Sequence, residues 1–249
     1  MPARTSNRNR QDRADQTREK ILRAAIREFS THGLAGARTD AIAESAKVNK
    51  ALLYYYFKSK NGLYTAALEE IAGKVVENAR AALDPGLSAG ERLLRSALNH
   101  FDRIWTQREF QSLMQQEMVR FRRGENAAMP LLVKTVFKPL LDKLQETVQE
   151  GIRTGELCEM EWLQVVYSML GANVFYFLSG PMIQIALRIK PFEVAAIKSR
   201  RRAAVQFLGL ALFADRAYGA RLAERVLAHM PMPEIKSPKV QRDVRREKS

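Results

Sequence analysis

Apolar residues recur at helical spacing through almost the whole chain, and no segment shows the sustained apolar–polar alternation of a β-strand. Glycines and prolines separate the helical stretches, and no internal repeat recurs at a fixed period. Hydrophobic residues make up 46% of the 249 residues and charged residues 27%, which is typical of a globular protein. The sequence therefore predicts an all-α fold.

Apolar periodicity and capping residues place the expected helices. Four are expected near the N-terminus: Gln16–His32, ended by Gly33; Asp40–Ala46, capped by Thr39; Lys50–Phe57; and Lys60 to about Ala82, capped by Ser59. Five more are expected after the break at Asp84-Pro85-Gly86: about Ala89–Thr106, Arg108–Arg123, Met129–Thr154 with a kink at Pro139, Glu161–Ser179 and Val194–His229.

The positive charge is concentrated at the beginning of the chain. The whole sequence carries a net charge of +14, and residues 1–60 hold 13 basic and 6 acidic side chains. Residues 61–230 hold 22 and 18 over almost three times that length. This excess of positive charge favours a polyanionic partner such as nucleic acid or an anionic membrane. A basic face exposed only to solvent would have the same composition.

The two ends and the cysteine content indicate the compartment. Residues 1–14 are expected to form a disordered basic arm and residues 231–249 a disordered basic tail, because both are polar and lack periodic apolar positions. The N-terminal segment has no apolar region of the kind that a secretory signal needs. Cys158 is the single cysteine, which excludes an internal disulfide framework. A cytoplasmic protein is expected.

Three short helices joined by tight turns, the last pair separated by three residues, form a helix-turn-helix pattern. In the third helix, Leu53 and Phe57 can pack inward, whereas Ala51, Leu52 and Tyr55 point the opposite way. That outward side is small, apolar or phenolic and carries no acid, so it can enter a major groove. The alternative is that the aromatic side chains pack against a later helix.

The stretch from Gln16 to Ile71 resembles the TetR family of bacterial transcriptional regulators. The matching positions are the Thr that opens the second helix, an Ile-Ala pair within it, a Val in the turn and a Tyr-x-x-Phe-x-x-Lys string with a Leu three residues on: Thr39, Ile42-Ala43, Val48, Tyr54, Phe57, Lys60 and Leu63. Two departures stand out. Lys47 occupies a turn position where the family usually has Gly, and Ala51-Leu52 replace the common Gly-Thr.

The resemblance implies roles in DNA binding for seven residues. Thr39, Tyr54 and Lys60 would contact phosphates. The other four would lie nearest to base edges: Lys50, Ala51, Leu52 and Tyr55. The arm from Arg4 to Arg13 either adds backbone or minor-groove contacts or is simply solvated.

The resemblance also implies a dimer with a ligand-binding domain, here residues 61–230, that follows a DNA-binding domain at residues 15–60. Trp162–Leu178 is apolar almost all round, and Val194–His229 carries small residues such as Gly209 and Ala211, so these helices are expected to form a four-helix bundle with their copies. The alternative for Trp162–Leu178 is a membrane span. This segment is slightly shorter than the roughly 18 apolar residues that a span needs, and it contains Gln164, Ser168 and Asn173.

Met and aromatic side chains at helical spacing are candidates for the wall of an apolar ligand pocket, although ordinary core residues show the same pattern. They are Phe101, Trp105, Phe110, Met114, Met118, Phe121, Phe137, Tyr167 and Phe175. A small apolar or amphipathic effector is the expected ligand. The Arg122-Arg123 pair either meets an anionic group on it or is solvated.

No enzyme, metal or cofactor pattern is found. The three histidines are scattered, and no glycine-rich phosphate loop is present. The sequence predicts a dimeric, sequence-specific repressor that a small ligand releases from a near-palindromic operator. It is expected to be cytoplasmic and associated with the nucleoid when bound to DNA. The alternatives are a helical small-molecule-binding protein or enzyme without specific DNA binding, and a non-specific architectural DNA binder.

Overall fold

The computed structural model describes residues 3–125 and 128–234, and of residues 3–10 it describes the backbone alone. Within these ranges the chain is helical and has no strand, so the all-α fold is confirmed; Leu157 and Phe213 form an isolated antiparallel bridge. The elements are α1 (Ala3–Gly36), α2 (Thr39–Ala46), α3 (Lys50–Phe57), α4 (Lys60–Ala82), α5 (Ala89–Thr106), α6 (Arg108–Arg122), α7 (Ala128–Leu132), the π-helical turn η1 (Val133–Phe137), α8 (Lys138–Arg153), α9 (Trp162–Leu187), α10 (Val194–Ala211) and α11 (Arg216–His229).

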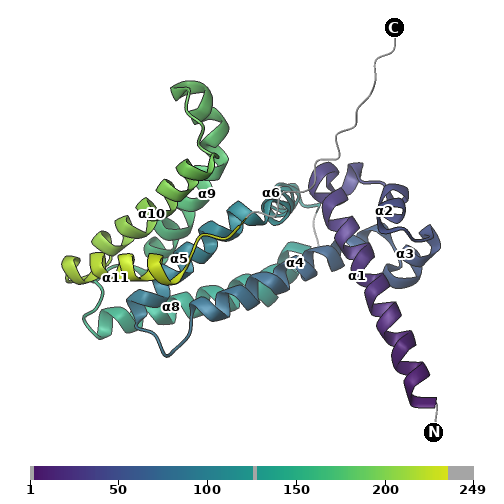
Figure 1. Cartoon of the computed structure of the whole chain (residues 1–249), viewed down its shortest axis with the longest axis horizontal. Coiled ribbons are helices and arrows are strands. Elements are labelled where there is room, and N and C mark those ends of the chain that lie inside the picture. The colour runs from purple at the N-terminus through teal and green to yellow at the C-terminus, as the bar shows by residue number, and fades with distance from the viewer. Residues whose placement is uncertain (1–2, 126–127, 235–249) are drawn as a thin grey trace.

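The helices form an elongated molecule with two ends (Figure 1). Helices α1, α2 and α3 gather at one end, and α5, α8, α10 and α11 lie toward the other, with α4 running between them. Ser59 caps α4 as expected, because its side chain accepts a hydrogen bond from the amide of Gly62 at 2.9 Å. Helix α4 is therefore the continuous link between the two ends.

The hydrophobic core is divided differently from the expected domain boundary at residue 60. One cluster joins α1, α2 and α3 to α4 through Leu63 and Leu68, and to α6 through Phe110 and Leu113. A second cluster fills the far end, between α5, α8, α9, α10 and α11. Because α4 and α6 contribute to the first cluster, the N-terminal helices share their core with the rest of the chain.

Helix α1 begins at Ala3, so the expectation of a disordered arm is wrong for residues 3–14. No Gly or Pro interrupts the chain between Ala3 and His32, and Thr17 donates a side-chain hydrogen bond to the carbonyl of Arg13 at 2.8 Å. Gly33 disrupts the helix as predicted, with φ of 67° and ψ of 176°. Residues 1–2 and 235–249, which include most of the expected basic tail, lie outside the described residues.

Two expected helix limits near the C-terminal end are also wrong. Helix α9 continues through Pro181 to Leu187, where an end at Ser179 was expected. Gly180 has no Cβ, which leaves room for the ring of Phe192 to lie against the helix at this point. The long helix expected at Val194–His229 is two helices, because Asp215 caps α11 by accepting hydrogen bonds from the amides of Ala217 and Tyr218.

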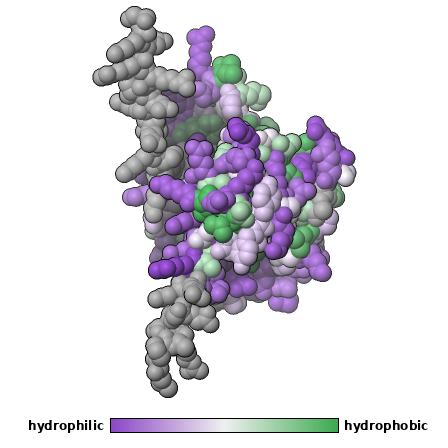
Figure 2. Space-filling view, turned by 90° about the vertical axis from the view of Figure 1, so that its right-hand side faces the viewer, coloured by the Kyte–Doolittle hydropathy of each residue, from purple (hydrophilic) through white to green (hydrophobic). Residues whose placement is uncertain are grey.

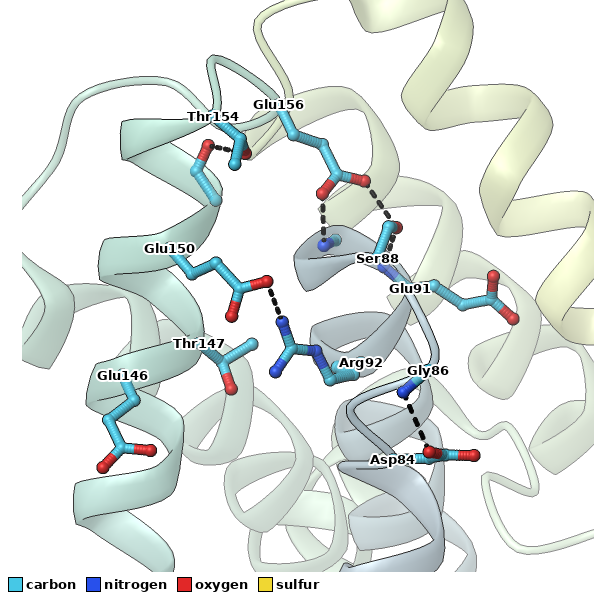
Figure 3. A network of polar contacts seen from close by, with 12 residues as sticks. Asp84, Gly86, Ser88, Glu91, Arg92, Glu146, Thr147, Glu150, Thr154 and Glu156 are labelled. Atoms are coloured by element: carbon cyan, nitrogen blue, oxygen red, sulfur yellow. Dashed lines mark hydrogen bonds and ion pairs between the residues drawn. The ribbon is translucent and has the colours of Figure 1, made fainter.

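A polar network around the buried Arg92 holds the far end together (Figure 3). Glu156 accepts hydrogen bonds from the hydroxyl of Ser88 at 2.7 Å and the amide of Gly90 at 2.9 Å, so it caps the first turn of α5. Nearby, the buried guanidinium of Arg92 pairs with Glu150 of α8 at 2.6 Å and lowers the pKa of that carboxyl. These contacts fix α5 against α8 and the α8–α9 connection.

Candidate nucleic-acid interface and ligand cavity

The turn between α2 and α3 is built on a lysine in the left-handed region. Lys47 has φ of 56° and ψ of 48°, and its amide donates to the carbonyls of Ala43 and Glu44 at the end of α2. This conformation costs an L-residue about 1–2 kcal/mol of conformational free energy, which explains why glycine is usual at such a position. Asn49 then caps α3 by accepting from the amide of Ala51 at 2.8 Å. Lys47 therefore adopts in this turn the left-handed conformation that glycine adopts readily.

Helix α3 separates its inward and outward sides as the spacing predicted. Leu53 and Phe57 are 2% and 7% exposed and belong to the first core cluster. On the outward side Leu52 is 37% exposed and Tyr55 69%, and Ala51 is also exposed. The alternative, that a later helix covers this side, is therefore wrong within the described residues. Figure 2 looks at this end of the molecule and shows a small neutral to apolar area among hydrophilic side chains.

The expected phosphate contacts surround this helix. Tyr54 is 42% exposed. Thr39 is the first residue of α2 rather than its cap, and the N-cap residue Arg38 makes no side-chain capping bond. Lys60 donates to the carbonyl of Ala35 at 3.1 Å, which leaves two of the three ammonium hydrogens for another acceptor.

Lys50 is engaged in an ion pair that the sequence did not indicate. Its ammonium lies 2.8 Å from the carboxylate of Asp40, so it connects the first turn of α3 to the first turn of α2. This hydrogen bond lowers the pKa of Asp40 and raises the pKa of Lys50. Both side chains are exposed, so a phosphate could compete with Asp40 for the lysine.

A basic groove next to the turn was missed by the sequence analysis. It has a volume of about 340 Å³ between α1 and the α2–α3 turn, and its lining residues are Thr17, Lys20, Arg23, Arg27, Ser45, Ala46, Lys47 and Val48. Lys20, Arg23 and Arg27 lie at intervals of three and four residues, so their shared face of α1 could have been read from helical spacing. The charge count identified the region but not this face.

The nine candidates for the pocket wall do not form a single site. Phe101, Trp105, Phe110 and Met114 are buried and Phe137 is half-buried. Four others are more than half exposed: Met118, Phe121, Tyr167 and Phe175. Helical spacing groups residues on one face, but it does not determine whether that face points to a neighbouring helix or to solvent. Their role in a ligand pocket stays a prediction.

A cavity of about 330 Å³ lies instead between α5, α6, α9 and the α9–α10 connection. Trp105 is the single predicted residue in its wall. The lining residues are Ile104, Trp105, Arg108, Gln111, Ser112, Gln115, Phe177, Leu178 and Phe192. Because the wall combines rings with polar side chains, it could hold a small amphipathic molecule.

Helices α9 and α10 leave many apolar side chains exposed. On α9 these residues form one stripe at intervals of eight, three, four and three positions: Tyr167, Phe175, Leu178, Met182 and Ile185. Phe207 and Leu210 are exposed on α10. Of the helices in the described ranges, α9 alone is long and apolar enough to cross a bilayer by length and composition. Its other side packs on α5, where the buried Asn173 donates to the carbonyl of Ala97 at 3.0 Å.

One apolar face of α10 packs inside the chain. Val205 and Leu208 of α10 are buried in the second core cluster, together with Leu212 and Phe213 of the following connection. Gly209 lies against the backbone of Gly219, so it allows α10 to approach α11 of the same chain closely. The outward face of α10 carries Phe207 and Leu210 instead.

Comparison with known families decides the identity of the chain. A model of the N-terminal domain of bacterial regulatory proteins of the tetR family matches residues 21–67, and a model of a tetracyclin repressor-like C-terminal domain matches residues 90–208. The chain belongs to the TetR family. The resemblance inferred from Thr39, Tyr54, Phe57 and Lys60 is thereby confirmed, and the chain is a regulator rather than an enzyme.

Relatives within the TetR family cover most of the chain. It is 28% identical to the HTH-type transcriptional repressor NicS of Pseudomonas putida over 69% of this chain and 80% of that protein. The structure of a gamma-butyrolactone receptor is similar with a TM-score of 0.65 at 18% identity, covering 88% and 100% of the two chains. A regulator from Saccharomonospora viridis in complex with choline has a TM-score of 0.63 at 17% identity, covering 80% and 98%.

Proposed function

We propose that this TetR-family protein is a dimeric, sequence-specific repressor in the bacterial cytoplasm, bound to the nucleoid at its operator and released by a small ligand. The observation that carries the proposal is the exposed outward side of α3, which is held by a buried inward side and flanked by basic residues. DNA is the polyanion that such a helix fits.

The exposure and chemistry of the side chains indicate which residues would contact bases and which would contact phosphates. Ala51, Leu52 and Tyr55 lie on the outward side of α3 and would meet base edges, with Leu52 against a thymine methyl group. Lys50 would approach the same bases after releasing Asp40. Three further residues would bind phosphates and fix the register: Thr39 with the first amides of α2, Tyr54 and Lys60.

The basic groove extends this surface. Lys20 and Lys47 lie in its wall without a carboxylate partner among the described residues, whereas Arg23 pairs with Glu19. A second stretch of DNA backbone passing the turn would meet these cations. Residues 15–60 therefore act as the DNA-binding part of the chain, and residues 61–230 as the ligand-binding and dimerising part.

The exposed stripe on α9 and the face of α10 would be covered by a second copy of the chain. Gly171 lies within the α9 stripe, and a side chain there would meet nothing of its own molecule, so a partner helix could approach closely. Four helices, two from each copy, would bury the stripe without a membrane. This arrangement keeps the expected interface on α9 and α10 and omits α11, which packs within the chain.

Oligomeric state tests the interface. Phe207→Glu should convert the dimer into a monomer in sedimentation velocity, because it places a charge in the centre of an apolar contact. Arg202→Glu, on an exposed part of the same helix, is the matched control and should remain dimeric. A Phe207→Glu protein that stays dimeric at the same concentration would contradict the assigned interface.

Selection of bound duplexes from a random DNA pool tests the function. A dimer with two recognition helices should enrich a near-palindrome with half-sites about 34 Å apart or at a longer related spacing. It should prefer that site by about 1,000-fold or more over random DNA. Enrichment without any shared sequence would favour an architectural DNA binder, and an absence of salt-dependent binding would favour a protein that does not bind DNA.

A further inference from the structure

The cavity between α5, α6 and α9 has two chemically different sides. Its apolar side is formed by Ile104, Trp105, Phe177, Leu178 and Phe192. Its polar side comes from one face of α6. It consists of Arg108, Gln111, Ser112 and Gln115, so none of the lining residues is acidic. At about 330 Å³ the cavity lies at the lower end of the range for small-molecule sites.

The apolar side is a set of aligned rings. Phe177 and Phe192 are stacked at an interplanar angle of 3° with their centroids 6.2 Å apart, and Trp105 is inclined by 27° to Phe177 at 6.4 Å. These rings come from α5, from α9 and from the connection that follows α9. A flat apolar group could lie against them with favourable ring contacts.

The polar side carries a cation that no acidic residue neutralises within the described structure. Arg108 lies over the ring of Trp105 at 5.4 Å and has no carboxylate partner among the described residues. Its guanidinium N–H groups can donate charge-assisted hydrogen bonds to an anionic group.

We propose that the effector of this regulator is a small amphipathic organic anion with a flat apolar body. The body lies on the rings of Trp105, Phe177 and Phe192, and a carboxylate or similar group accepts hydrogen bonds from Arg108. This inference rests on the proposed function, since it names the ligand class of the regulatory domain. A cationic ligand is disfavoured, because the only charged lining residue is an arginine.

The same cavity is connected directly to the DNA-binding end. The hydroxyl of Ser112, a lining residue, donates to the carbonyl of Ser30 in α1 at 2.6 Å, and Gln116 donates to the same carbonyl at 3.1 Å. Ser30 precedes the disruption of α1 at Gly33, where helix carbonyls need outside partners. An anion that attracts the Ser112 hydroxyl, or that rotates α6, would therefore change the hydrogen bonds from α6 to the Ser30 carbonyl of α1. Release from the operator requires that the anion bind one of these two arrangements more tightly than the other.

Fluorescence titration of the full-length protein tests the ligand class. In a Trp162→Phe background Trp105 is the remaining tryptophan, so it reports on the cavity. The probes are benzoate, benzyl alcohol and phenyltrimethylammonium, which share a ring and differ in charge. We expect saturable quenching by benzoate, with affinity at least about tenfold above that for the neutral or cationic probe.

Variants of α6 locate the anion. Arg108→Gln should remove the preference for benzoate and leave the affinity for benzyl alcohol unchanged. Arg122→Gln is the control, because Arg122 is exposed on the same helix and does not line the cavity. Equal affinity for all three probes, no saturable response to benzoate, or an Arg108→Gln protein with unaltered preference would each overturn the proposal.

Operator binding separates this inference from the proposed function. Benzoate should weaken binding to the selected operator, and Ser112→Ala should retain benzoate binding while reducing this effect. If the protein bound benzoate through Arg108 but no operator, the proposed function would fail and the anion site would stand. If it bound its operator but showed no preference for the anion, the ligand class alone would be wrong.

Discussion

A half-buried histidine makes the stability of this protein depend on pH. Burial between α5 and α9, together with the nearby positive charge of Arg103, lowers the pKa of His100 to about 3. The unfolded chain protonates this imidazole near its ordinary pKa of 6.5. Stability is therefore fully present above pH 6.5 and is lost as the pH falls toward the pKa of the folded state.

The loss is at most about 1.4 kcal/mol per pH unit, or about 2.7 kcal/mol between pH 6.5 and pH 4.5. Urea unfolding followed by far-UV circular dichroism, at fixed protein concentration, measures this slope. His100→Gln should flatten it. His229→Gln is the control, because His229 is exposed and its loss should leave the slope unchanged. Equal slopes for the wild type and His100→Gln would refute the assignment of a neutral half-buried imidazole.

Three further substitutions test other contacts. Glu156→Ala removes three side-chain hydrogen bonds at the start of α5 and α11, so it should lower the free energy of unfolding by about 2–4 kcal/mol in urea titrations. Tyr64→Phe removes the 2.7 Å hydrogen bond to the fully buried Glu117 and should cost about 1.5–3 kcal/mol in the same assay. Asp40→Asn removes the ion pair that Lys50 has to release before it reaches a base edge, so it should raise the affinity for the selected operator in electrophoretic titration.

Each of these three predictions has a result that contradicts it. A Glu156→Ala protein no less stable than a variant at the exposed Glu159 would show that the cap is unimportant. Unchanged stability in Tyr64→Phe would mean that the α4–α6 hydrogen bond contributes nothing net. An operator affinity in Asp40→Asn equal to or below that of the wild type would mean that Lys50 does not take part in reading the bases.

Local signals were sufficient to predict the DNA-binding end. Ser59 and the apolar spacing in α3 indicate where α4 begins and which side of α3 is buried, because these effects act within one or two turns. Gly33 likewise ends the regular part of α1. The helical spacing of Lys20, Arg23 and Arg27 is visible in the sequence. They line a groove only because the α2–α3 turn packs beside α1, and this tertiary contact cannot be read from the spacing.

The regulatory end could not be predicted in the same way. A proline usually ends a helix, yet α9 continues through Pro181, and Phe192, eleven positions later in the chain, packs at Gly180. The spacing of Tyr167 and Phe175 is that of an amphipathic helix whether the apolar face meets its own core, a ligand or a second copy. The cavity arises from side chains on three helices and a connection, so no single segment shows it.

The central claim is that the outward side of α3 reads base sequence while Lys60 holds the backbone. Binding of Leu52→Ala and Lys60→Ala to every single-base variant of the selected operator tests it directly. Leu52→Ala should change preference at one base pair of each half-site, by about 1–3 kcal/mol, and keep the salt slope. Lys60→Ala should weaken binding to all sequences and flatten the slope by about 0.9. Indistinguishable profiles for the two variants would contradict the assignment of α3 as the reading helix.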